Sequence, residues 1–304
     1  MNNDTTTDKI ASSAMSPIEE VQRLKAEIWM EDYIPKSLEG MSAKQAKKKL
    51  AELPVIVAEG DSWFDYPVGI DVLDQIRRLW GYTIHSFSKA GDTLENMAYG
   101  TDIHRNFKRK TAEIEEVKAA VRKHKPGFVL FSGGGNDVAG DELIGFLNHV
   151  DAASYGRGKA WLRADVWTSA LSQMEAAIKH FATAMWSAHP STKIVMHGYA
   201  RPVPDGRAVI NFPFGFKFVG PWLRPAFARK GHPNWERTEA YVGRLIDDYN
   251  DLIAKVAKDL GKKFIYVDTR PAVGRNDWAN ELHPTNAGFE AVAKKIHQDA
   301  LVQM

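Results

Sequence analysis

The sequence contains no cysteine among its 304 residues, which excludes disulfides, thiolate metal sites, iron–sulfur clusters and cysteine nucleophiles. It also has no run of about 18 apolar residues, so it predicts no integral membrane segment. Neither sign of charge is in large excess, since the formal net charge is +2. This charge is too small to predict binding to nucleic acid or to an anionic membrane. A hydrophobic content of 44% and a charged content of 26% are those of an ordinary soluble globular protein.

The start of the chain lacks the basic residues and the apolar stretch of a secretory signal. We therefore expect a cytoplasmic location, with export by a route that needs no signal peptide left open. Residues 1–15 are polar and predict a disordered tail. Residues 16–52 predict an N-terminal helical appendage, because two capping-box patterns begin at Ser16 and Ser42.

Short apolar runs alternate with helical patterns from residue 53 onward. The runs predict strands at 54–59, 82–87, 127–132, 193–198 and 263–268. Apolar residues at helical spacing follow in the regions 72–80, 114–121, 171–185, 245–260 and 289–296. This alternation predicts a parallel sheet with helices on both faces, in one domain that spans residues 53–304.

The region 201–236 does not fit this alternation and is too long for an ordinary connection. It is rich in proline and carries the aromatic residues Phe212, Phe214, Phe216, Phe218, Trp222, Phe227 and Trp235. These aromatics either pack a second small core or form a lid over a substrate. The sequence favours both interpretations about equally.

Other ligand-binding patterns are weak. The triple glycine at 133–135 lacks the Gly-Lys-Ser/Thr of a phosphate-binding loop, and no metal-binding pair of histidines occurs, so we expect neither a nucleotide, a cofactor nor a metal. The basic run at 104–110 is conceivable as a nucleic-acid contact, but in a nearly neutral chain it is more typical of a solvated helix face.

Four residues with complementary chemistry lie in the loops at the ends of predicted strands. Ser62 follows the first predicted strand, Gly91 the second and Asn136 the third. His283 lies between the fifth predicted strand and the last predicted helix. In an open parallel sheet these loops meet at the carboxyl edge, where ligands bind. A hydroxyl nucleophile, a base and oxyanion donors are the parts of an acyl-transfer site.

With these residues and the short motifs around them, the sequence resembles the SGNH (GDSL-type) hydrolase superfamily. The matching blocks, in order over residues 55–300, are Gly60-Asp61-Ser62, Gly91, Gly134-Gly135-Asn136-Asp137 and His283-Pro284. The resemblance implies a flavodoxin-like three-layer α/β/α sandwich with a five-stranded parallel sheet of order 2-1-3-4-5. It implies Ser62 as nucleophile, His283 as general base, and an oxyanion hole formed by the Ser62 and Gly91 N–H groups and the Asn136 side chain.

One position departs from the family pattern. The family usually has aspartate three residues before the histidine, where this chain has Asn280. We expect Asn280 to orient His283, with Asp277 as the alternative and Glu281 pointing away. Pro284 is expected in the first turn of the next helix, whose positive end would keep the imidazole neutral.

The sequence therefore predicts a serine hydrolase that cleaves small-molecule, lipid or glycan carboxylic esters through an acyl-enzyme on Ser62. A lipase or phospholipase and a carbohydrate O-acetyl esterase are narrower alternatives. A non-catalytic binding module on the same fold is the alternative from another class.

Overall fold

The computed structural model describes residues 16–152, 161–209, 220–232 and 235–302. Its parallel sheet contains β1 (Ile56–Gly60), β2 (Ile84–Ser86), β3 (Phe128–Ser132), β4 (Lys193–His197) and β5 (Phe264–Val267), in the order β2-β1-β3-β4-β5. All five strands lie within the predicted runs or within one residue of them, and the predicted order is confirmed. Strands β1 and β3 are buried along their whole length, which explains their unbroken apolar sequence.

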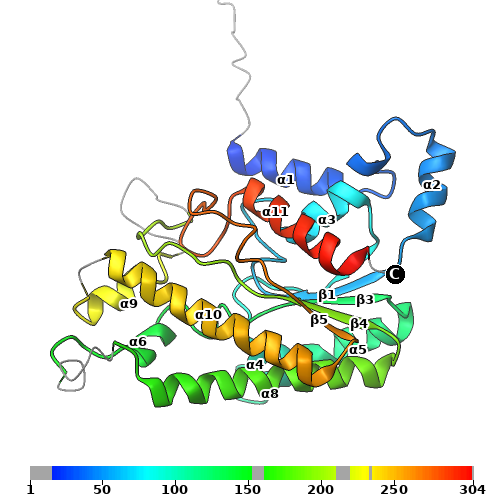
Figure 1. Cartoon of the computed structure of the whole chain (residues 1–304). Helices are drawn as coiled ribbons and strands as arrows, with labels where there is room; N and C mark the ends of the chain where they lie inside the picture. Colours follow the sequence, from blue (N-terminus) through cyan, green and yellow to red (C-terminus); the bar gives the residue numbers. More distant parts are fainter. Residues whose placement is uncertain (1–15, 153–160, 210–219, 233–234, 303–304) are drawn as a thin grey trace, which may run out of the picture.

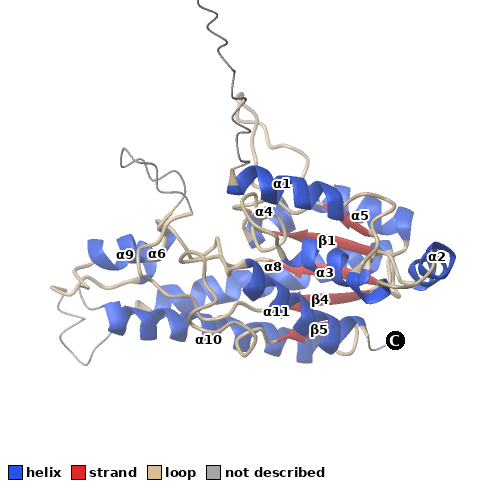
Figure 2. Ribbon diagram, turned by 90° about the horizontal axis from the view of Figure 1, so that it is seen from above, coloured by secondary structure: helices blue, strands red, loops and turns tan. Residues whose placement is uncertain are grey.

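Helices cover both faces of the sheet (Figures 1 and 2). One face carries α3 (Val72–Trp80) and α11 (Asn286–Ile296), followed by the π-helical turn His297–Leu301. The other carries α4 (Leu94–Tyr99), α5 (Glu113–His124), α8 (Ala164–Ala188) and α10 (Trp235–Leu260). The predicted three-layer α/β/α architecture is therefore confirmed.

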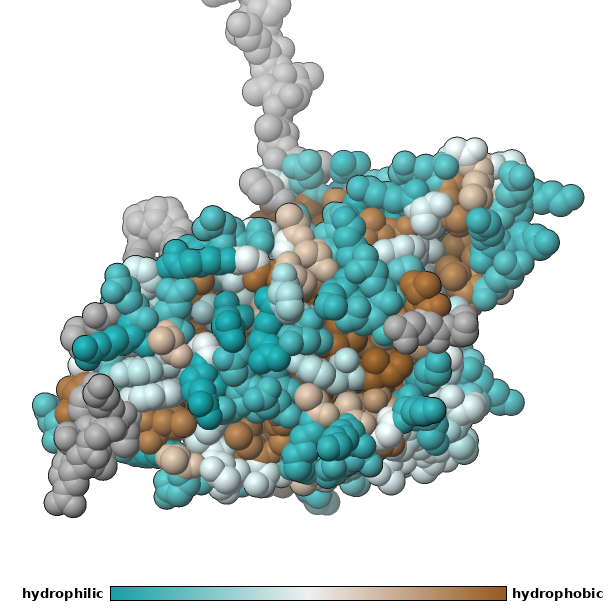
Figure 3. All heavy atoms as spheres, in the orientation of Figure 1, coloured by the Kyte–Doolittle hydropathy of each residue, from teal (hydrophilic) through white to brown (hydrophobic). Residues whose placement is uncertain are grey.

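The main core lies between the sheet and these helices and is closely packed. Phe131 of β3 stacks on Phe181 of α8 with 4.0 Å between the ring centres, and Phe289 of α11 is fully buried on the opposite face. Hydrophilic residues dominate the surface drawn in Figure 3, where hydrophobic residues form separate patches. No helix among the described residues is long and apolar enough to cross a bilayer.

The N-terminal segment 16–52 packs on α3 and contains α1 (Pro17–Ile28), the 3-10 turn Lys36–Leu38 and α2 (Ala43–Glu52). Both predicted capping boxes are present, at Ser16 and Ser42. The ammonium of Lys25 lies 2.8 Å from a carboxylate oxygen of both Asp71 and Asp74. This buried pair of carboxylates attaches α1 to the start of α3.

A second, smaller core lies at one end of the molecule, beside α6 (Glu142–Phe146) and α9 (Arg224–Arg229), which appear together on the left of Figure 1. Phe227 is fully buried there, so one aromatic residue of the region 201–236 packs a second core. The phenylalanines 212, 214, 216 and 218, expected in either a second core or a lid, lie outside the described residues, as does the tail 1–15.

One local prediction is wrong. The basic run 104–110 is not a helix face but an exposed turn closed by a bridge between Ile103 and Arg109. Phe107 at its tip has a φ of 62° and is 85% exposed. The predicted solvent exposure of this run is correct, although its predicted helical conformation is not.

Candidate active site

Ser62 lies on the turn directly after β1, and a buried carboxylate anchors this turn. Asp61 is 2% exposed and accepts hydrogen bonds from the Trp63 N–H and the Ser132 hydroxyl, each at 3.0 Å, and from the Tyr199 hydroxyl. Gly60 is required because a Cβ atom there would lie 2.8 Å from Ser132. These contacts fix the backbone on both sides of Ser62.

A chain of hydrogen bonds joins Ser62, His283 and Asn280. The Nε2 atom of His283 lies 2.8 Å from the Ser62 Oγ, and its Nδ1 atom lies 2.9 Å from the Asn280 Oδ1. The same Oδ1 accepts the backbone N–H groups of Leu282 and His283, each at 3.0 Å. A backbone N–H can only donate, so the atom facing it is the amide oxygen and His283 must carry its hydrogen on Nδ1. Its Nε2 is then free to accept the Ser62 proton.

Tyr66 supports this chain from one side, a contact that sequence reasoning missed. Its ring stacks on the His283 imidazole with 4.3 Å between centres and 16° between planes. Its hydroxyl oxygen accepts the Asn280 amide at 3.0 Å. The aromatic run after Ser62 was the available signal, but the contact joins positions more than 200 residues apart and no local pattern reveals it.

Burial keeps His283 neutral. The residue is 4% exposed, and removal of the imidazolium from water lowers the pKa of His283 to about 3. The expectation for Pro284 is wrong, because Thr285 is the N-cap and α11 begins at Asn286, so Pro284 precedes the first turn.

Asp277 and Glu281 both have other partners. A carboxylate oxygen of Asp277 accepts the backbone N–H of Gly274 at 2.8 Å, which closes a local turn. The carboxylate of fully buried Glu281 accepts four backbone N–H groups, at 2.7–3.0 Å, from Gly206, Trp222, Leu223 and Arg224. Glu281 therefore anchors the described part of the 201–236 region beside the His283 loop.

The three N–H donors expected for an oxyanion belong to the turns that follow β1, β2 and β3. Hydrogen bonds from the Lys89 N–H to the Gly60 carbonyl (2.8 Å) and from the Ala90 N–H to Asp65 (3.1 Å) hold the Gly91 loop against the end of β1. Gly91 has a φ of 88°, which favours glycine. Within the described part of the chain, neither the Gly91 nor the Ser62 N–H has a protein acceptor. Both donors are therefore available to a ligand.

Asn136 contributes the third donor, from the loop after β3. One hydrogen of its amide is donated to the Asp92 carbonyl at 2.8 Å, which orients the group and leaves the second hydrogen available. The glycines before it serve packing, because a Cβ atom at Gly134 would lie 2.2 Å from the Tyr249 hydroxyl.

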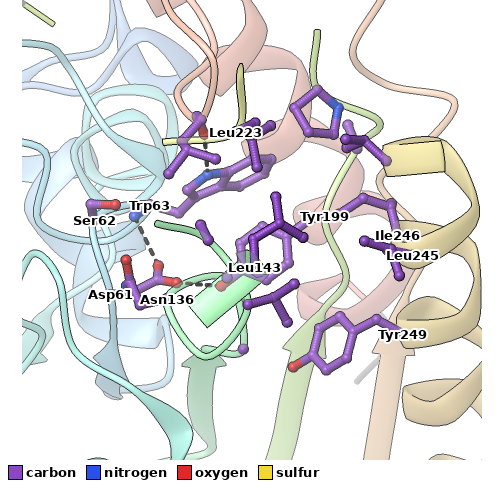
Figure 4. Close-up of a pocket in the computed structure, with 18 of the residues that line it drawn as sticks. Asp61, Ser62, Trp63, Asn136, Leu143, Tyr199, Leu223, Leu245, Ile246 and Tyr249 are labelled. Carbon is purple, nitrogen blue, oxygen red and sulfur yellow. Dashed lines mark hydrogen bonds between the residues drawn. The ribbon is translucent and has the colours of Figure 1, made fainter. Parts of the chain in front are cut away.

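An apolar pocket opens next to Ser62 (Figure 4). Ser62, Asp61 and Asn136 lie at one end, and Leu143, Leu223, Leu245 and Ile246 line the part farther from Ser62. The site thus combines a hydroxyl–imidazole–amide chain with N–H donors and an apolar cavity.

A hydroxyl, an imidazole and N–H donors at the carboxyl edge of a five-stranded parallel sheet are the groups that an α/β/α hydrolase of the acyl-transfer class needs. Residues 60–291 match the model of the GDSL-like Lipase/Acylhydrolase family, and the chain belongs to this family. It is therefore a hydrolase acting on ester bonds, which confirms the enzyme class expected from the sequence.

Solved structures show similarity at low sequence identity. A Clostridium thermocellum family 3 carbohydrate esterase has 14% identity and a TM-score of 0.47, with 83% of this chain and 96% of that chain covered. An extracellular lipase from Streptomyces rimosus has 17% identity and a TM-score of 0.45, with 81% and 99% covered. None of the curated proteins compared with the chain matches it.

Proposed function

We propose that the protein is a serine esterase in which Ser62 attacks the ester carbonyl and His283 is the general base. The observation that carries this proposal is the hydrogen-bonded chain from the Ser62 Oγ through His283 to Asn280. Asn280 is a positioning residue, since it holds the imidazole with Nε2 toward the serine. The N–H groups of Ser62 and Gly91 and the Asn136 amide stabilise the oxyanion.

In the first half-reaction the Ser62 proton passes to the Nε2 of His283 while Oγ bonds to the carbonyl carbon. The carbonyl oxygen becomes an oxyanion, and its collapse breaks the bond to the alcohol, which takes the proton from His283. A water molecule then repeats these steps on the acyl-enzyme, which releases the acid and restores Ser62.

The pocket favours an ester whose acyl chain is longer than acetyl. Its wall away from Ser62 is aliphatic and aromatic, and each CH₂ group buried there contributes about 0.8 kcal/mol of binding free energy. An acetyl group would leave this wall empty. The lining therefore supports a lipase-like preference over carbohydrate O-acetyl ester cleavage.

The test is a series of p-nitrophenyl esters from acetyl to dodecanoyl, combined with labelling by a fluorophosphonate. We expect a maximum beyond acetyl and a single label on Ser62. The Ser62→Ala variant should lose both, and Ser86→Ala, which changes an exposed serine at the end of β2, should lose neither. Turnover retained by Ser62→Ala would overturn the mechanism, and highest kcat/KM on acetyl would overturn the chain-length preference.

A further inference from the structure

Three carboxylates from separate parts of the chain converge beside β1. Glu59 belongs to β1, Asp92 to the loop that carries Gly91, and Glu113 is the first residue of α5. One carboxylate oxygen of each lies within 4.8 Å of the others. The three positions are 33 and 21 residues apart (92 − 59 and 113 − 92), so no local spacing reveals the cluster.

Glu59 and Asp92 are buried, and all three carboxylates are incompletely bonded. Glu59 is 0% exposed; its Oε1 accepts the Gly60 N–H at 3.0 Å, and its Oε2 has no partner in the described part of the chain. Asp92 is 8% exposed; its Oδ1 accepts the Thr93 N–H and the Asn96 amide, and its Oδ2 has no described partner. The Oε2 of Glu113 likewise has none. A buried, ionised carboxylate oxygen without a donor is costly, and a bound cation would remove this cost.

Among the described residues, Lys89 forms an ion pair with this cluster. The Lys89 ammonium pairs with the Oε1 of Glu113, while the Lys89 side chain is 58% exposed. Three carboxylates and one ammonium leave a charge of −2 when all are ionised (−3 + 1). A divalent cation would neutralise this charge.

We propose that Glu59, Asp92 and Glu113 bind a divalent cation of the Ca²⁺ type. Ca²⁺ takes six to eight oxygen ligands at about 2.3–2.6 Å, so two ligand oxygens can lie up to roughly 5 Å apart. Glu113, whose side chain is 13% exposed, borders solvent, so water can complete the coordination.

The site would position the oxyanion donors. Asp92 directly follows Gly91, and the backbone carbonyl of Asp92 accepts the Asn136 amide at 2.8 Å. A cation on the Asp92 carboxylate would hold both donors through this one residue. This consequence rests on the proposed esterase function, whereas cation binding itself does not.

The direct test uses the full-length protein after treatment with EDTA. Calorimetric titration with CaCl₂ should show one saturable site per chain, and Tm should rise by about 5 °C at a hundredfold excess over Kd. Glu59→Gln and Glu113→Gln should lose both effects. Glu115→Gln is the matched control, because Glu115 lies in the same first turn of α5 but is exposed and pairs with Lys118.

Two other arrangements could satisfy the carboxylates without a metal. In the first, Glu59 keeps its proton, because burial raises the pKa of Glu59 to about 8. In the second, the Lys89 ammonium is the cation of the site. Both predict no saturable Ca²⁺ binding, and that result would overturn the site. Binding retained in Glu59→Gln, or a Tm rise that NaCl reproduces at equal ionic strength, would also overturn it.

Variants at Lys89 and at the carboxylates keep the test independent of folding defects. If Ca²⁺ competes with the ammonium, Lys89→Gln should bind Ca²⁺ several-fold more tightly, and unchanged or weaker binding would contradict the proposal. Glu59→Gln removes one of three crowded negative charges, so in EDTA its Tm should equal or exceed that of the wild type.

Ester hydrolysis gives the functional measurement. Removal of Ca²⁺ should lower kcat by about tenfold with little change in KM, less than the roughly 10²–10³-fold cost of losing an oxyanion donor. Ca²⁺ binding without any ester hydrolysis would contradict the proposed function but not the cation site. An equal kcat with and without bound Ca²⁺ would overturn the positioning role.

Discussion

The Oδ1 atom of Asn280 accepts the Nδ1–H of His283 at 2.9 Å, in a place where a carboxylate would add a negative charge. The amide fixes the tautomer and the direction of the ring as a carboxylate would. It adds no charge to stabilise the imidazolium that would form if Ser62 gives its proton to His283, as proposed. Burial also disfavours the imidazolium form of His283, so both features favour a neutral imidazole.

The first prediction concerns pH. The base must be neutral, and burial lowers the pKa of His283 to about 3, so kcat/KM should stay on its plateau as the pH falls through 6.5, where an exposed histidine would protonate. Asp137, whose pKa burial raises to about 6, could add an acid limb of its own. The profile is therefore repeated with Asp137→Asn. An acid limb between pH 6 and 7 that persists in this variant would contradict a buried, neutral His283.

The second prediction compares Asn280 with Asp277. Asn280→Ala removes the acceptor of the His283 Nδ1–H and should lower kcat by about 10²-fold or more, whereas Asp277→Asn changes only a turn contact to Gly274 and should cost less than tenfold. Asn280→Asp should be tolerated and should move the acid limb of kcat/KM upward, because a carboxylate stabilises the imidazolium. A loss of about 10⁴-fold in Asp277→Asn would instead make Asp277 the partner of His283.

The third prediction concerns the oxyanion. Asn136→Ala removes one N–H donor and should lower kcat by about 10²–10³-fold with little change in KM. Asn276→Ala removes an exposed amide outside the Ser62 pocket and should leave both constants unchanged. A change confined to KM would show that Asn136 binds the ground state of the substrate and not the oxyanion.

The fourth prediction concerns Glu281. In Glu281→Gln the new amide group faces backbone donors that need an acceptor, so the free energy of unfolding should fall by about 1–3 kcal/mol for each donor left unpaired. Leu223, held by this carboxylate, lines the pocket, so kcat/KM should fall more for long esters than for acetyl. Urea unfolding and the ester series measure the two effects.

Glu239→Gln is the control for this variant, because Glu239 forms a partly exposed ion pair with Arg275. It should change the free energy of unfolding by less than about 1 kcal/mol. Equal losses of stability in the two variants would contradict the anchoring role of Glu281.

The sequence by itself determined the sheet and the order in which the chain reaches its carboxyl edge. Strand and helix patterns are local: the short apolar run 127–132 has the length of a buried strand and is bounded by glycines, whereas the helical regions are longer and follow a 3.6-residue period. The end of β1 therefore placed Ser62, and the family pattern placed His283 and Asn280 in one loop. Asn280 lies three residues before His283, so a short turn was enough to join them.

Only the tertiary structure decided the contacts between distant segments. The stacking of Tyr66 on His283, the four N–H groups around Glu281, and the meeting of Glu59 with Asp92 and Glu113 depend on which loops the sheet order brings together. We expected no metal from the sequence because it lacks ligand residues at the short spacings of known metal motifs. The three carboxylates of the proposed cation site are far apart along the chain, so this criterion could not detect them. Spacing along the chain cannot show such contacts, because burial and hydrogen bonding depend on distance in space.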